Sequence, residues 1–359
     1  MKNGRTLTQL AEELDRQRGL KRDFVLDTRA ATATPHIIPD SSTQGNGIDL
    51  DIVNMDKFKV NDIANSQIGA RLDIPKKYYD KMLSDAPNLL CTNINHWFTN
   101  KPEQRMVRTL DGTARAFLSD RYRPLDNYDL ADAVLPQMLE ANLDVRSCEV
   151  TDKRLYIKAV SHELEGEVKK GDAVRSGVMV SNSEVGLGSL FVGPFLERLV
   201  CTNGMVVNDF AKRKYHVGKK ANTVDMNDAY ELYTDKTKEV TDKAFWMQVR
   251  DIVSGVLSEK GFDSILHSLK LAAEIPIKDD PMVVVEKTQK KFGFTDKEKG
   301  GILQALLRDD EYTKWGLANA ITRTAEDSDS YDRATELETT GWNVVQMPKQ
   351  DWVALSGAA

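Results

Sequence analysis

Cysteine is scarce in this 359-residue sequence, and long apolar runs are missing from it. The three cysteines, Cys91, Cys148 and Cys201, lie far apart, form no CxxC pair and have no histidine at ligand spacing. A disulfide framework and a structural zinc site are therefore disfavoured. No stretch of about 18 apolar residues occurs, and the charged N-terminus lacks the apolar core of a signal peptide. We expect a cytoplasmic protein without a membrane segment.

Patterns that carry catalysis are also missing. The five histidines are scattered without an HExxH pair, and no GxSxG elbow occurs. The glycines of the segment 181–194 match neither phosphate-binding loop pattern and are typical of turns and bulges. We therefore expect no cofactor, and an enzymatic site is disfavoured. Acid pairs such as Asp309 with Asp310, or Asp327 with Asp329, keep a metal-dependent nucleic-acid-processing enzyme as a lower alternative.

An excess of positive charge is missing as well, since the net charge is −6 and the pI is about 5.6. The overall field of such a protein repels phosphate. Nucleic-acid binding would therefore require a local basic patch.

The patterns that are present predict an α+β protein, with an antiparallel β-meander and a packed helix followed by a helical C-terminal region. Residues 1–55 are expected to form an N-terminal arm and linker, residues 56–222 an α+β core domain, and residues 223–359 the helical region. The arm contains a helix over residues 5–19 after a capping Thr, and turn-rich residues 28–51 are expected to form an extended or flexible connection.

Within the core domain, prolines at 75 and 87 are expected to divide a helical segment, because proline removes a backbone donor. Asp111 and Gly112 predict the turn of a β-hairpin. A helix over residues 124–142 and four strand-like runs follow, the last of them over residues 189–207. In the second run, Leu155, Ile157 and Ala159 are expected to face the helix, while the alternate residues face solvent or a ligand.

Two basic clusters are the candidate functional residues. The hairpin region 105–123 contains five arginines against Asp111 and Asp120, and residues 212–220 contain five cations and no acid. Arginine binds phosphate bidentately, and aromatic rings can stack on unpaired bases. The ordinary alternative for both clusters is a solvated surface paired with the chain's own acids. The candidate nucleic-acid-binding residues are Arg105, Arg108, Arg115, Phe117, Arg121, Tyr122, Arg123, Lys212, Arg213, Lys214, Tyr215, Lys219 and Lys220.

Two further features bear on function. Cys201 lies in an apolar run and is expected to be a small core residue. Residues 309–338 carry nine acidic side chains against three basic ones, which is typical of a solvated acidic flank. If the arginine hairpin met this flank in a neighbouring subunit, the chain would act through protein contacts, for example in phage assembly or host takeover.

Several runs resemble one family. RMVRTLDGTARAFLSDRYRPLDNYDLADAVLP, SNSEVGLGSLFVGPFLERLVCTNGMVV, YHVGKK and WGLANAITRTAEDSDSYDRATELE resemble the phage/plasmid-like proteins, a prophage- and plasmid-borne family of unknown function, over about residues 60–345. The order of a helix, antiparallel strands with a basic hairpin and further helices is also similar to phage single-strand annealing proteins. That resemblance implies a homo-oligomer that binds single-stranded DNA in recombination or replication.

Overall fold

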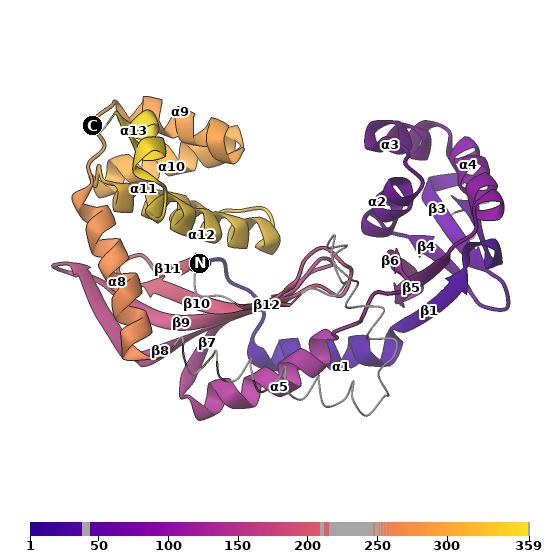
Figure 1. Ribbon diagram of the computed structural model, residues 1–359, viewed down its shortest axis with the longest axis horizontal. Coiled ribbons are helices and arrows are strands. Elements are labelled where there is room, and N and C mark those ends of the chain that lie inside the picture. Colours follow the sequence, from indigo (N-terminus) through magenta and orange to yellow (C-terminus); the bar gives the residue numbers. More distant parts are fainter. Residues whose placement is uncertain are drawn as a thin grey trace, which may run out of the picture.

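The computed structural model describes residues 1–37, 44–208, 212–214 and 257–357, together with residues 247, 251, 253 and 255. Two mostly antiparallel sheets and the helices on them make an α+β protein, as predicted. In Figure 1 the C-terminal helices lie at one end of the molecule, and the first sheet with its helices, which we call the N-terminal lobe, lies at the other end. The strand β12 (Lys212–Lys214) lies between them. Within the described residues, no helix is long and apolar enough to cross a bilayer.

The first sheet, with three helices on it, forms the N-terminal lobe. Its strand order is β1-β5-β6-β4-β3-β2. The strands are β1 (Arg22–Asp27), β2 (Ala31–Ile37), β3 (Gln44–Ile52), β4 (Lys57–Val60), β5 (Gln104–Leu110) and β6 (Thr113–Ser119). The helices are α2 (Asp62–Arg71), α3 (Lys76–Asp85) and α4 (Pro87–Asn100), with the short 3-10 helix η1 (Thr28–Ala30) between β1 and β2.

Local sequence signals explain several of these boundaries. Helix α3 begins after Pro75 and α4 begins at Pro87, as the prolines predict. Asp111 and Gly112 have φ angles of 50° and 71°, so both adopt the left-handed conformation that the predicted hairpin turn needs. The extended connection expected over residues 28–51 is wrong, because this segment contributes two paired strands, β2 and β3. The predicted domain boundary at residue 55 falls between β3 and β4, which pair in one sheet.

The second sheet is the predicted meander, in the order β11-β10-β9-β8-β7. Its strands are β7 (Leu143–Val150), β8 (Leu155–Lys169), β9 (Asp172–Asn182), β10 (Leu190–Arg198), β11 (Asn203–Val206) and β12 (Lys212–Lys214). The strand-like run at 189–207 divides into β10 and β11 at a turn. Cys201 lies in this turn, half-buried, so its expected place inside a strand is wrong.

Helices cover both faces of the second sheet. Leu155, Ile157 and Ala159 pack in one core with α1 (Leu7–Leu20) and α5 (Asn127–Glu140), as the alternation predicts. Thr6 caps α1 and forms a capping box with Gln9. On the opposite face the alternate residues of β8 meet α12 instead of open solvent, since Lys158 pairs with Glu338.

The C-terminal lobe is helical, as predicted. It contains α8 (Glu259–Glu274), α9 (Pro281–Phe292), α10 (Asp296–Asp309), α11 (Lys314–Thr324), α12 (Tyr331–Val345) and α13 (Lys349–Ser356). Trp315 of α11 and Trp342 of α12 are fully buried in a core that also includes Leu196 and Met205 of the sheet. Most of residues 225–257, which belong to the predicted helical region, lie outside the described residues.

The packing of α5 on the second sheet generates a stability prediction. Leu130 is fully buried between the two, whereas Leu139 of the same helix is 63% exposed. Leu130→Ala should lower the free energy of unfolding by about 2–5 kcal/mol, because it leaves a cavity in the core. Leu139→Ala is the control and should change it by less than about 0.5 kcal/mol. Urea denaturation measures both, and equal effects would show that α5 does not pack as described.

Candidate functional site

The arginines of the hairpin lie mostly inside the molecule. Arg108 of β5 is fully buried, and its guanidinium donates hydrogen bonds to Asp23 at 2.9 Å, to Asp126 at 2.6 Å and to the carbonyl oxygen of Glu184 at 2.9 Å. Burial disfavours its charge, but the hydrogen bond to Asp23 and the charge of Asp126 outweigh that effect and raise its pKa. Arg108 is therefore not available to phosphate, and its prediction as a contact residue is wrong.

Glu184, in the loop between β9 and β10, binds further charged and polar groups next to Arg108. Its carboxylate accepts hydrogen bonds from Lys21 at 3.1 Å and from the backbone N–H of Asn127 at 2.6 Å, and it pairs with Arg115 at 2.7 Å. Burial opposes its ionisation, but the charges of Arg115 and Lys21 hold its pKa below the usual range. Lys21 also pairs with Asp126 at 2.8 Å.

These residues form what we call the Arg108 cluster. It consists of three cations and three carboxylates: Lys21, Arg108, Arg115, Asp23, Asp126 and Glu184. The residues come from β1, β5, β6, the end of α1, the start of α5 and the β9–β10 loop. The cluster therefore joins the N-terminal lobe to the second sheet. The charges of the cluster balance, and Arg115 is ion-paired with Glu184 within the chain. This contradicts the prediction that Arg115 binds phosphate.

The predicted stacking residues of the hairpin are buried too. Phe117 is 5% exposed and stacks on Phe98 with ring centroids 5.7 Å apart. Tyr122 is 3% exposed, and its hydroxyl donates to the carbonyl oxygen of Ser183 at 3.1 Å. Neither ring is open to a nucleic-acid base, so this expectation is also wrong.

The remaining hairpin arginines differ in exposure. Arg105 is buried, pairs with Glu103 and lines a separate cavity of about 410 Å³ in the N-terminal lobe. Arg121 is exposed and Arg123 is half-buried. The hairpin region thus does not present five arginines on one open surface.

The second basic cluster lies elsewhere. The backbone of Lys212–Lys214 forms β12, which pairs antiparallel with Leu190, Phe191 and Val192 of β10. Tyr215, Lys219 and Lys220 lie outside the described residues. The described part of this cluster therefore runs along the outer edge of the second sheet.

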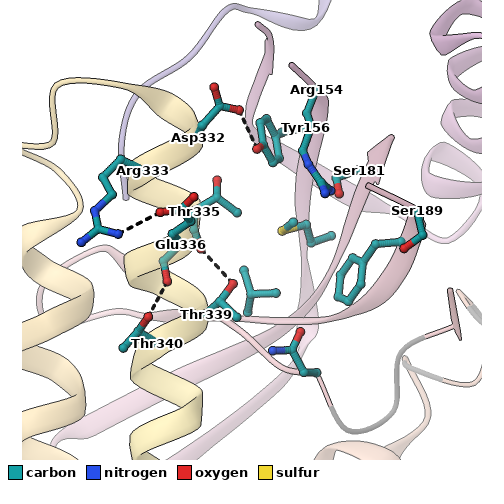
Figure 2. Close-up of a pocket in the computed structure, with 14 residues that line it drawn as sticks. Arg154, Tyr156, Ser181, Ser189, Asp332, Arg333, Thr335, Glu336, Thr339 and Thr340 are labelled. Carbon is teal, nitrogen blue, oxygen red and sulfur yellow. Dashed lines mark hydrogen bonds and ion pairs between the residues drawn. The ribbon is translucent and has the colours of Figure 1, made fainter. Parts of the chain in front are cut away.

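A cavity of about 440 Å³ opens beside this edge, between the second sheet and α12. The strands contribute the apolar side chains of Met179, Phe191 and Val206, and α12 contributes Thr335 and Thr339. Figure 2 shows Asp332 of α12 accepting a hydrogen bond from Tyr156 across the cavity, at 2.7 Å. We call this space the α12 cavity.

Two further cavities follow the α12 cavity in a row, each sharing lining residues with the one before it. One of about 380 Å³ lies between α1, the hairpin turn and the β7–β8 turn, and shares Arg154 with the α12 cavity. The next, of about 730 Å³, reaches α2 and α3 and shares Asn61, Asp152 and Lys153 with the second. Because neighbouring cavities share lining residues, we describe the three as one groove from α12 to the N-terminal lobe, and call it the polar groove after the charged residues Asp152, Lys153 and Arg154 where the cavities meet.

Lys153 and Arg154 lie where these cavities meet. Lys153 is exposed, and neither residue has an ion-pair partner among the described residues. Arg154 donates to the carbonyl oxygen of Leu187 at 2.9 Å, and its guanidinium lies over Gly188, where an added Cβ would collide with Nη2. Sequence reasoning missed this pair, although the turn TDKR places two adjacent cations between strands.

A buried ion pair lies under the α12 cavity. Lys158 and Glu338 are both fully buried, and Lys158 also donates to Thr335 at 3.2 Å. Burial lowers the pKa of Lys158, and the nearby Glu338 carboxylate opposes this effect. The pair fixes α12 against β8 and so sets the position of the cavity wall.

One member of each acid pair considered for magnesium is engaged with a cation. Asp309 lies 3.2 Å from Arg308 and 3.7 Å from Arg323, and Asp329 pairs with Lys297 at 2.7 Å. In the part of the chain that the structure describes, no group of three or more His, Cys, Asp or Glu residues could hold a metal ion.

The Arg108 cluster generates the second stability prediction. Arg108→Ala leaves the carboxylates of Asp23 and Asp126 without their main partner, so the free energy of unfolding should fall by about 3–5 kcal/mol. Arg22→Ala removes an exposed ion pair with Asp56 and should cost less than about 1 kcal/mol. Chemical denaturation compares the two variants. If Arg108→Ala were as stable as Arg22→Ala, the cluster would not hold the lobes together.

Comparison with known proteins gives one match. The domain of unknown function DUF932 matches residues 116–347, which run from within β6 to just beyond α12 and include the whole second sheet. No curated protein and no solved structure matches the chain. Because the match covers more than half of the sequence, the chain belongs to the DUF932 family, whose function is unknown.

Proposed function

We propose that this protein binds single-stranded nucleic acid along the polar groove. Lys153, Arg154 and the basic strand β12 would neutralise the phosphates. The observation that carries the proposal is the position of these cations: Lys153 and Arg154 join the adjoining cavities without a carboxylate partner among the described residues, and β12 pairs with the strand that carries Phe191 of the α12 cavity.

The size of the cavities favours single strands over a duplex. Spaces of about 380 and 440 Å³ suit single nucleotide units, and an unpaired strand can turn its bases toward a protein surface. A duplex presents mainly its phosphate backbone and keeps its bases stacked inside. The similarity of the element order to phage single-strand annealing proteins points to recombination or replication as the setting. Annealing and homo-oligomer formation stay predictions of the sequence.

Protein contact between an arginine hairpin and the acidic flank is less well supported. The hairpin arginines Arg108 and Arg115 are paired in the Arg108 cluster. In the flank, Glu311 pairs with Lys169 at 2.6 Å and Glu326 with the N-terminal amine at 2.7 Å. Several of the charges on which that alternative depends therefore already have partners within the chain.

A binding titration tests the proposal. Fluorescence polarisation with an oligothymidine of about 16 nucleotides should show salt-dependent binding that weakens steeply between about 50 and 200 mM salt. Lys153→Ala with Arg154→Ala should reduce the magnitude of the slope of log K against log salt by about 1 to 1.5, because two phosphate contacts are lost. Charge reversal of Lys212, Arg213 and Lys214 should reduce it further.

The matched control removes two adjacent cations from the C-terminal lobe. Lys290 and Lys291 lie at the end of α9, away from the groove, and their double alanine variant should leave the slope unchanged. The proposal would be wrong if the wild-type protein bound no oligonucleotide, or if both double variants changed the slope equally. Size-exclusion chromatography of the same samples, with and without the oligonucleotide, measures oligomer formation.

Gly188 provides a separate prediction about the position of Arg154. A Cβ at residue 188 would meet the guanidinium of Arg154, which is the far end of a flexible side chain and can move aside. Gly188→Ala should therefore weaken oligonucleotide binding as much as Arg154→Ala does, while the melting temperature changes by less than about 2 °C. Combining the two substitutions should give no additional loss, because both remove the same contact. Additive losses in the double variant would contradict this role for Gly188.

A further inference from the structure

We infer that the α12 cavity receives one nucleotide unit of the bound strand, with its base against the strands of the second sheet and its phosphate at Arg154. This inference rests on the proposed function and deepens it, because it distinguishes a site that recognises a base from a surface that contacts only the backbone.

The sheet side of the cavity is suited to a base. Met179, Phe191 and Val206 belong to the neighbouring strands β9, β10 and β11, and together they form an apolar surface. Phe191 is only 6% exposed, so it contributes part of the apolar wall and not a free ring face for stacking. An apolar surface at the edge of a polar groove therefore favours the planar base over the sugar-phosphate backbone.

Serine hydroxyls with unused hydrogen-bonding capacity line the same side. Ser181 is 1% exposed and Ser189 is 8% exposed, neither hydroxyl bonds another described residue, and both residues line the cavity instead of lying sealed in the core. Figure 2 shows both on the strand side of the cavity, with α12 opposite them. Because they line the cavity, these hydroxyls can exchange hydrogen bonds with water or with a ligand there. The polar edge of a base or a sugar hydroxyl would supply these bonds.

The wall formed by α12 carries acids, but these are already engaged. Asp332 accepts hydrogen bonds from Tyr156 and Thr151, and Glu336 accepts one from Arg333 at 2.8 Å. Thr339 donates to the carbonyl oxygen of Thr335 in its own helix. This wall therefore presents hydroxyl oxygens and partnered carboxylates to the cavity.

Arg154 connects the cavity with the rest of the groove. It uses one guanidinium nitrogen for the carbonyl oxygen of Leu187, which leaves N–H groups available to a phosphate. Because Arg154 lines both the α12 cavity and the next one, a phosphate bound there lies between the nucleotide in the cavity and its neighbour in the strand.

A comparison of two oligonucleotides tests this assignment. Polarisation titrations use oligothymidine and an abasic strand of equal length, so the ratio of their dissociation constants measures the contribution of the bases. The wild-type protein should prefer oligothymidine by about fivefold to a hundredfold. Thr339→Phe fills the cavity and should bring the ratio close to one, whereas binding of the abasic strand should stay unchanged because the phosphate contacts remain.

Thr92→Phe is the matched control. Thr92 is exposed on α4 and makes the same bond to the carbonyl four residues before it as Thr339 does, but it lies outside the groove. This variant should keep the wild-type ratio. Thr340→Phe fills the cavity from the next position and provides a second measurement if Thr339→Phe lowers the melting temperature.

The outcomes separate the two proposals. If the wild-type protein bound neither strand, the proposed function itself would fail. If it bound both and Thr339→Phe kept the wild-type ratio, the α12 cavity would not hold a base, although the groove would still bind the backbone. Thymidine monophosphate, titrated alone, distinguishes a free nucleotide from a unit of a strand, and binding as tight as that of the oligonucleotide would overturn the assignment to a strand.

Discussion

The arrangement of the two lobes depends on a charge-balanced ionic cluster in the interior. Moving a guanidinium out of water costs several kcal/mol, and the cost is recovered only where its partners are complete and well placed. Arg108 meets this condition because Asp23, Asp126 and the carbonyl oxygen of Glu184 surround it. Each partner comes from a different segment, so the cluster forms only when the first sheet, α5 and the β9–β10 loop take their native positions. The lobes are thereby fixed, and the groove between them has a defined shape.

Local sequence patterns predicted most elements of the fold. Asp111 and Gly112 predicted the hairpin turn, and the prolines predicted the starts of α3 and α4. The alternation of apolar residues in β8 predicted the face that packs on α5. The segment 28–51 was missed because turn-forming residues outnumber its alternating apolar ones. Its strand character depends on pairing between β2 and β3 and on the cover of α4, and a local window contains neither partner.

The candidate site was predicted less well, and the reason is physical. A local window shows the density of arginines but not the acids that neutralise them. Asp23 lies 85 residues from Arg108 in the sequence, and the Glu184 carbonyl lies 76 residues away. The same limit affects the acidic flank, since Glu311 and Glu338 pair with Lys169 and Lys158 of the distant strand β8. Conversely, Lys153 and Arg154 form no dense patch, and only the topology brings them to the groove. The second basic cluster was better placed, because β12 lies along the edge of the sheet beside the α12 cavity.

The loop between β9 and β10 connects the Arg108 cluster with the groove. Its first half holds the N-terminal lobe: Glu184 belongs to the Arg108 cluster, and the carbonyl oxygen of Val185 accepts a hydrogen bond from Gln67 of α2 at 2.7 Å. Its second half builds the groove, because the Leu187 carbonyl and the bare backbone of Gly188 position Arg154. The glycines of this loop match no nucleotide-binding loop pattern. Gly188 instead allows an arginine from another turn to lie against the backbone. A displacement of the N-terminal lobe would therefore move Arg154 as well, so the position of the lobe and the shape of the groove are coupled through this one segment.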